Sequence, residues 1–436
     1  MTVSDSLNRS GRGTPWKMVN PALEDRSEYR LYIAQMIFLL GIFMKQFYLH
    51  HSGTLQTGDA LMMAGCALYI FAVKRGRLAI REEHRWYFAF FVSGLLVNSV
   101  YFVISQEEDL LISSSYYLFN LIIILVFSEM LREKNRVLFA RALGIVLKVS
   151  VAIQAALYFL GLGNWQGAQR YIGTFRDPNQ FGIFIFFALL MIYLCDHVTR
   201  NRWWPVWSLF AMITVMPSAS TGTMLGIVLF WAGMYFSNFR SMKKVWRLVF
   251  GFMTALFILL FLIFGLGVVQ LPDSITSHFM YVRIISKVEM LMGSGGLDTL
   301  LTDRIWDRVA EQPIYFIYGS GEGWNKRFEV RGYELHSSIL GPAFAYGIVP
   351  FSFLLIWVVK IIRRSRYLFI YIAMFVEAMF VVNTRQPMFW MIMLMALVTP
   401  KDRFEEEEAE INAAEAAKIF VLGKPRRRLE AVPLKS

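Results

Sequence analysis

Long runs of apolar residues recur along this chain, and they constrain its fold more than any other feature. Twelve stretches can be distinguished, at 31–49, 58–73, 86–104, 110–127, 137–161, 180–196, 203–217, 220–236, 245–269, 338–359, 367–383 and 386–399. Most approach the roughly 20 residues that a helix needs to cross the hydrocarbon core of a bilayer. Two double-length runs, 203–236 and 367–399, are divided at Pro217–Thr221 and at Asn383–Gln386. The sequence therefore predicts an all-α polytopic membrane protein with about 12 transmembrane helices.

The composition favours the same class. Hydrophobic residues make up 56% of the chain and charged residues 17%, whereas soluble domains have roughly 45–50% and about a quarter. This balance excludes a soluble enzyme, a disordered protein and a disulfide scaffold. The two cysteines, Cys66 and Cys195, lie inside apolar runs, so we interpret them as small core residues rather than as metal ligands or a disulfide.

The positive charge of the chain is concentrated in alternate short loops. Basic loops lie at 74–85, 128–136, 197–202, 237–247 and 360–366, whereas the segments 50–57, 105–109 and 217–221 contain no Lys or Arg. This alternation is typical of membrane orientation and predicts that both termini lie in the cytoplasm. The net charge of +12 therefore does not indicate a nucleic-acid partner.

The loop pattern also divides the chain into parts. We expect a cytoplasmic N-terminal tail at 1–30, transmembrane helices one to nine within 31–269, a large outer loop at 270–337, three further helices within 338–399 and a cytoplasmic tail at 400–436. Helical spacing within the outer loop predicts helices over 274–291 and 298–311, the second closed by Pro313. The C-terminal tail is interpreted as solvated, with a basic patch near lipid headgroups.

Few ionisable residues lie within the apolar stretches. Lys148 is near the inner end of its stretch, where its ammonium group can reach the interface, and Glu377 is deeper but stands alone in its predicted helix. A proton-coupled carrier normally has more such groups, together with paired broken helices. A transporter is therefore the less favoured interpretation of a chain with this many spans.

One outer loop, 161–179, ends in a group of residues suited to an anion. Arg170 and Arg176 offer planar guanidinium groups that match phosphate oxygens. Asn179 is expected to cap the following helix, whose positive end faces outward. The segment therefore predicts an anion site, and the alternative is a capped helix with arginines lying on lipid headgroups.

A second group of residues closes the large outer loop. It contains Gly319, Gly321 and Gly323, followed by Glu334 and His336 at the mouth of the next span. A neutral imidazole can accept a proton near pH 7, and Glu334 is close enough in sequence to orient it. The glycine run is a weak phosphate-binding signal. The alternative is that His336 has a structural role.

Taken in order, these elements resemble the O-antigen polymerase and ligase superfamily. The resemblance rests on the segment Arg170-x-x-Gly173-x-Phe175-x-x-Pro178-Asn179 before a span, the late outer loop, Asp303-Arg304-Ile305-Trp306, Gly319-x-Gly321 and a histidine at the start of the next span. It covers roughly 165–350. The chain departs from the family where Ser220-Thr221-Gly222 replaces a frequent Ser-Arg-Gly, so one expected cation is missing.

The resemblance implies a GT-C-like enzyme of the bacterial inner membrane. Its substrate would be an undecaprenyl-diphosphate-linked oligosaccharide, and it would join repeat units at the periplasmic face into exopolysaccharide or O-antigen without a metal or other cofactor. A flippase and a chain-length regulator are the implied partners, besides the lipid bilayer. The alternatives are a ligase that moves the glycan to a lipid or protein acceptor, and a non-enzymatic polysaccharide or lipid carrier.

The resemblance also assigns roles to individual residues. His336 would act on the acceptor as a general base or hydrogen-bond partner, and Arg170 and Arg176 would contact the diphosphate. The further substrate-binding positions are Arg304, Asn179, Glu334 and Gly321.

Overall fold

The computed structural model describes residues 26–49, 56–167, 169–239, 242, 244–265, 282, 286, 306–323 and 335–400. The predicted outer loop 270–337 is therefore described only in part. Arg304 and Glu334, together with most of the helix expected over 274–291, lie outside the described residues.

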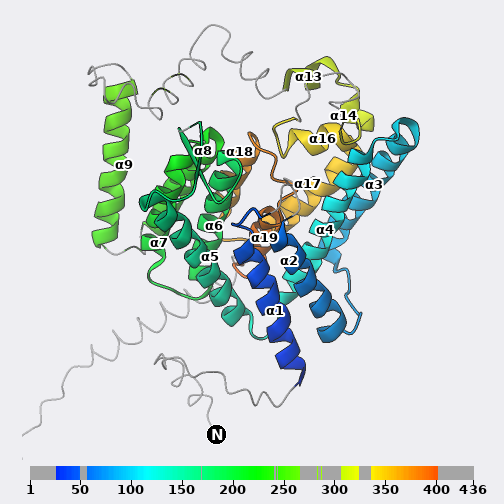
Figure 1. The fold of residues 1–436 in the computed structure, drawn as a ribbon, viewed down its shortest axis with the longest axis horizontal. Coiled ribbons are helices and arrows are strands. Elements are labelled where there is room, and N and C mark those ends of the chain that lie inside the picture. The colour runs from blue at the N-terminus through cyan, green and yellow to red at the C-terminus, as the bar shows by residue number, and fades with distance from the viewer. Residues whose placement is uncertain are drawn as a thin grey trace, which may run out of the picture.

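The described chain is mostly helical, and each predicted apolar stretch contains a helix (Figure 1). The helices that match these stretches are α1 (Arg26–Met44), α2 (Thr57–Leu68, continued by η2, Tyr69–Val73), α3 (Arg85–Ser105, preceded by η3, Glu82–His84), α4 (Glu108–Met130), α5 (Arg136–Phe159), α6 (Pro178–Val198), α7 (Trp204–Val215, followed by η4, Met216–Ser218), α8 (Thr221–Asn238), α9 (Lys244–Gly265), α16 (Leu340–Tyr346) with α17 (Ile348–Ile362), α18 (Leu368–Ala378) and α19 (Pro387–Leu394, followed by η5, Met395–Leu397). Two short helices, α13 (Trp306–Glu311) and α14 (Tyr315–Tyr318), belong to the outer loop.

Four of the described helices are long and apolar enough to cross a membrane: Glu82–Ser105, Glu108–Met130, Arg136–Phe159 and Pro178–Val198. Large apolar side chains also point outward, including Ile104 on α3, which is 74% exposed. An apolar exterior of this kind suits lipid rather than water. The structure thus supports a membrane-embedded protein, whereas the count of 12 spans stays a prediction.

Helix α6 forms the centre of the bundle. It is apolar on all sides and almost completely buried, and it contacts α5, α7, α8 and α19. Helix α19 in turn contacts α4, α6 and α17, so it joins the two halves of the bundle that Figure 1 shows on either side of it. Because α6 begins at Pro178, the centre of the fold carries the segment that was predicted to bind an anion.

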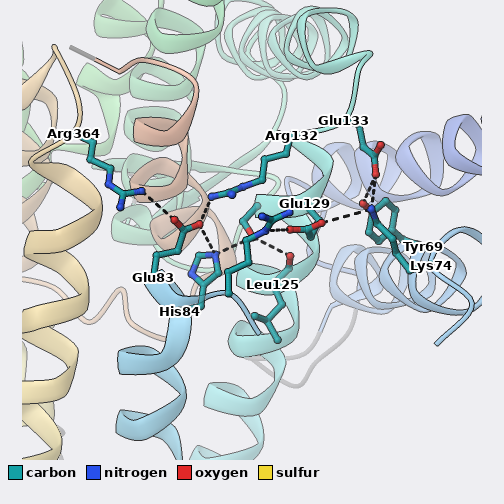
Figure 2. Close-up of polar contacts among 11 residues, drawn as sticks. Tyr69, Lys74, Glu83, His84, Leu125, Glu129, Arg132, Glu133 and Arg364 are labelled. Carbon is teal, nitrogen blue, oxygen red and sulfur yellow. Dashed lines mark hydrogen bonds and ion pairs between the residues drawn. The ribbon is translucent and has the colours of Figure 1, made fainter. Parts of the chain in front are cut away.

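Three of the basic loops meet on one face of the bundle. Glu83, from the loop 74–85, pairs with Arg132 and with Arg364, which come from the loops 128–136 and 360–366 (Figure 2). Since α3 begins at one of these loops and α4 ends at another, the segment 105–109 that joins their other ends lies on the opposite face. These three basic loops and the segment 105–109, which has no Lys or Arg, therefore lie on two opposite faces of the structure.

The stretch 338–359 was expected to form one helix, and this expectation was wrong. The chain breaks at Gly347, which has φ 78°, between α16 and α17. A Cβ at this position would lie 2.5 Å from the carbonyl oxygen of Ile317. The loop that follows α14 also donates two hydrogen bonds to α16, from Ser320 N to Phe344 O (3.0 Å) and from Gly321 N to Ala345 O (2.8 Å). The break thus lets a loop pack backbone to backbone against α16.

The division of 367–399 near Asn383–Gln386 is confirmed, because α18 ends at Ala378 and α19 begins at Pro387. A bridge between Ser365 and Pro400 brings the two open ends of this helical hairpin together. Helix α18 has 11 residues, a rise of about 16 Å, roughly half the thickness of a hydrocarbon core. Its polar tip, where Asn383 is fully buried, is therefore recessed in the bundle.

Candidate functional site

Arg170 lies at the start of a small hairpin before α6. Strand β1 (Asn164–Gln166) pairs antiparallel with β2 (Arg170–Gly173). Arg170 donates from Nε to the carbonyl of Ser218 and from Nη2 to Oδ1 of Asn179, both over 3.0 Å. The arginine therefore ties the hairpin to the first turn of α6 and to the junction before α8.

Tyr171 anchors the hairpin. Its ring is buried, and its hydroxyl donates to the carbonyl of Leu162 over 3.0 Å. Burial raises the pKa of Tyr171 to about 12, and neighbouring Tyr158 contributes in the same direction. The phenol therefore stays protonated at neutral pH and keeps this hydrogen bond.

Asn179 was expected to cap α6, and this detail was wrong. The cap is Asp177, whose Oδ1 accepts from the backbone N of Asn179 over 2.7 Å, and Pro178 takes the first helical position. Proline is favoured there because it has no N–H to satisfy. Asn179 is thus inside the first turn, and its side chain binds Arg170 instead.

A cavity of about 250 Å³ brings Asn179 and His336 together. Its walls come from the end of α1, the start of α6, the approach to α16 and the tip of the α18–α19 hairpin. The lining residues are Lys45, Tyr48, Phe175, Asp177, Asn179, Gln180, Ile183, Phe184, Phe187, His336, Val381, Val382, Gln386 and Met388. Arg170 does not line the cavity but holds Asn179, which does, and Arg176 is exposed in the turn before α6.

Lys45 places a cation in the cavity wall, a role that sequence reasoning missed. Its Nζ lies 2.9 Å from Oδ1 of Asp59, and the two side chains are only 5% and 8% exposed. Asp59 also accepts from the backbone N of Gln56 over 3.1 Å at the start of α2. The sequence offered one signal for this role, a lysine near the end of an apolar stretch. Its partner Asp59 could not be identified because it lies in another stretch.

Tyr48 completes this side of the cavity. Its backbone N donates to the carbonyl of Thr174 over 3.3 Å, so the end of α1 is fixed to the segment that follows β2. Its hydroxyl is hydrogen-bonded to the side chain of Gln386 from the hairpin tip. The two contacts hold three separate segments around the same space.

A second polar group lies beside the cavity. Arg385 Nη2 is 3.4 Å from Oε2 of Glu322, and the hydroxyl of Tyr346 donates to Oε1 of Glu322 over 2.9 Å. Arg385 precedes the cavity residue Gln386 in the chain, so the two polar groups are adjacent. The signal for Arg385 was its position in a short polar break between two apolar runs on the outer side.

Gly321 is buried, and its backbone N is bound to Ala345 O. The glycine run therefore serves the packing of the loop against α16. Its neighbours Glu322 and Gly323 line a small space of about 30 Å³ together with Ser337.

Both ionisable residues noted within the apolar stretches have partners. Glu377 is fully buried and accepts from Nδ2 of Asn383 at the hairpin tip. Lys148 pairs with Asp196 and lies 5.6 Å from the ring centre of Trp207, instead of reaching the interface alone. Sequence spacing could not show either pairing, because the partners follow the helix end or belong to another helix.

An apolar groove of about 280 Å³ begins next to the polar site. It lies between α17, α18 and α19, with Ser338 and Thr384 at one end and Ile362 further along. Ser338 is two residues from His336, and Thr384 directly precedes Arg385. Ser338 and Thr384 thus lie close in the chain to residues of the polar site, and the groove extends from them between the three helices.

Neither family models, nor curated proteins, nor solved structures match this chain. Within the described ranges, no group of three or more His, Cys, Asp or Glu residues has the geometry to hold a metal ion.

Proposed function

We propose that this chain is a glycosyltransferase that polymerises undecaprenyl-diphosphate-linked repeat units at the periplasmic face of the bacterial inner membrane. The observation that carries the proposal is the cavity that Asn179 and His336 line together with Lys45. These groups come from distant parts of the chain, and the cavity is on the face opposite the basic loops. An imidazole, an amide and a cation in one recessed space suit transfer from a diphosphate donor.

The proposed reaction balances without a cofactor. The oxygen of an acceptor hydroxyl bonds to the anomeric carbon of the donor sugar, and the bond from that carbon to the diphosphate oxygen breaks. The lipid diphosphate leaves with the electron pair, and His336 takes the proton of the hydroxyl. Lys45 stabilises the charge that develops on the departing diphosphate.

Asn179 contributes orientation in this scheme. Its Oδ1 is bound to Arg170, so its amide NH₂ remains to donate to a substrate oxygen. Arg170 acts through Asn179 as a positioning residue, and the exposed Arg176 would meet the diphosphate only at the entrance. Arg304 and Glu334, outside the described residues, keep the roles that the family resemblance implies.

The apolar groove supplies a place for the polyprenyl chain. It starts at Ser338 and Thr384 beside the polar cavity and continues along α17 and α19. A lipid diphosphate bound with its headgroup in the cavity could extend its chain into this groove. The orientation predicted from the basic loops places both termini in the cytoplasm and the cavity outside, where a flippase would deliver the donor and a chain-length regulator would act.

Reconstitution tests this function directly. The full chain, purified in lipid nanodiscs, is given lipid-linked repeat units extracted from cells that lack it. A ladder of products that differ by one repeat, with release of undecaprenyl diphosphate, is the expected result. A single transfer to another acceptor would instead identify a ligase. Movement of intact lipid-linked units across a vesicle without bond formation would identify a carrier and overturn the proposal.

A further inference from the structure

A second cavity, of about 470 Å³, lies on the opposite face of the bundle among the basic loops. Five cationic and two acidic side chains line it: Arg81, Arg132, Lys360, Arg363, Arg364, Glu82 and Glu83. They come from three separate loops, so the cavity is a product of the fold and not of one basic segment. It has no part in the proposed transfer reaction, which uses the other face.

Of the two acidic residues in the cavity wall, Glu82 is exposed and Glu83 is paired. Glu83 contacts Arg132, and its Oε2 lies 3.0 Å from Nη1 of Arg364 (Figure 2). Arg81 is bound to Glu129 of α4, and the same carboxylate is 3.5 Å from Lys74. One carboxylate thus holds two guanidinium groups in the cavity wall, which leaves an excess of positive charge there.

Two of the cations have no carboxylate partner among the described residues. Arg363 is exposed, and Lys360 has its Nζ 5.2 Å from the ring centre of Trp86. Nε of Arg132 is also buried without a hydrogen-bond acceptor in the described part of the chain. A buried donor of this kind is costly unless an acceptor oxygen occupies the site.

The surroundings indicate which anion would fit. Helices α3 and α17 pack together beside the cavity, and α3 carries exposed apolar side chains in the turns that follow Glu82 and Glu83: Phe88 (40%) and Val92 (47%). Trp86 is an aromatic residue of the type found where a bilayer meets water. The cavity is therefore at headgroup depth, with apolar surface leading from it toward the interior of the membrane.

We propose that this cavity binds the phosphate headgroup of an anionic phospholipid, whose acyl chains lie along α3. Guanidinium forks match phosphate oxygens, and basic pockets between helices on the cytoplasmic side suit acidic headgroups. The lipid would link the three loops from which the cavity is built. This site is independent of the transfer reaction, so either proposal can fail without the other.

Native mass spectrometry of the delipidated full chain tests this site. Dioleoylphosphatidylglycerol is titrated against dioleoylphosphatidylcholine, with inorganic phosphate as a soluble competitor. The test variant is Lys360→Gln with Arg363→Gln, which leaves the Glu83 pairs in place. The control, Lys244→Gln with Arg202→Gln, removes equal charge from exposed side chains in the basic loops 237–247 and 197–202, which do not line the cavity.

We expect phosphatidylglycerol to bind the unaltered chain and the control alike, and the test variant about 30-fold more weakly, because each of the two basic groups removed contributes roughly 1 kcal/mol near an acidic headgroup. Equal weakening in both variants would show unspecific attraction and overturn the proposal. Equal affinity for both lipids would do the same. Complete displacement of the lipid by millimolar inorganic phosphate would show a soluble-anion site instead.

Discussion

Arg170 and Asn179 form a hydrogen bond of 3.0 Å from Nη2 to Oδ1, while Nε of the same arginine binds the carbonyl of Ser218. The guanidinium group therefore binds two partners at once. Its Nη2 orients an amide in the cavity wall, and its Nε fixes the turn before α8. The function of this arginine depends on its planar shape as well as on its charge.

The first prediction is that Arg170→Lys lowers polymer formation at least about tenfold while the protein remains in the membrane. Lysine keeps the charge but cannot make both contacts from a rigid fork. Polymer length and amount in cells, compared with protein abundance, measure the effect. Arg176→Lys is the matched control, because Arg176 is exposed in the same segment, and it should be affected much less. Near-normal polymer in Arg170→Lys would remove Arg170 from the site.

The second prediction concerns the Lys45–Asp59 pair. Removing one partner of a buried pair leaves an uncompensated charge and typically costs about 3–5 kcal/mol. Lys45→Met should therefore lower the thermal unfolding temperature and abolish polymer. The double variant Lys45→Met/Asp59→Asn should regain much of the stability, because neither group is then charged.

Activity separates the two roles of this lysine. If Lys45 stabilises the leaving diphosphate, the double variant stays inactive although it is stable. A stable double variant with normal polymer formation would show that the pair is only structural.

The third prediction tests the apolar groove. Leu355→Trp should fill part of the groove, raise the KM for the lipid-linked donor several-fold and leave kcat nearly unchanged, because the chain is held in ground state and transition state alike. Val349→Trp on the same helix is the control, since Val349 is 57% exposed and does not line the groove. An unchanged KM in Leu355→Trp would exclude this groove as the chain site.

The fourth prediction is the topology. Reporter fusions at Arg81, Lys243 and Arg364 should report the cytoplasm, and fusions at Gly53, Gly167 and Gly295 the periplasm. The pairing of Glu83 with Arg132 and Arg364 already places three basic loops on one face. A cytoplasmic signal at Gly167 would put the cavity on the wrong side for a lipid-linked donor delivered by a flippase.

Periodicity and loop charge predicted much of the fold. Helix positions follow from runs of apolar residues, and breaks such as Pro217–Thr221 follow from residues that cannot continue a helix. The sequence predicted that Asn179 and His336 both lie on the outer face. It did not predict that they line one cavity. The break at Gly347 was missed because it depends on the approach of Ile317 and Gly321, which belong to another segment.

The remaining site residues could not be found by reading along the chain. Lys45 gains its place from Asp59, and Arg385 from Glu322, through contacts between segments that spacing does not relate. Glu377 likewise has its partner in Asn383, beyond the end of its own helix. Ion pairs across a bundle are decided by packing, which a single sequence records only indirectly.

The central claim is that His336 accepts the proton when the glycosidic bond forms. A positioned base contributes typically about 10²–10⁴-fold to rate, so His336→Ala should lose that much. Cells that carry this variant at normal abundance should accumulate lipid-linked single repeats. His278→Ala, from the same predicted outer loop, serves as the control and should do much less.

The most direct measurement is the rate of undecaprenyl diphosphate release by purified His336→Ala in nanodiscs, relative to the unaltered chain and to His278→Ala. The account predicts a loss of at least about 100-fold in His336→Ala alone, with an unchanged unfolding temperature. Release at the normal rate, with polymer of normal length, would contradict it.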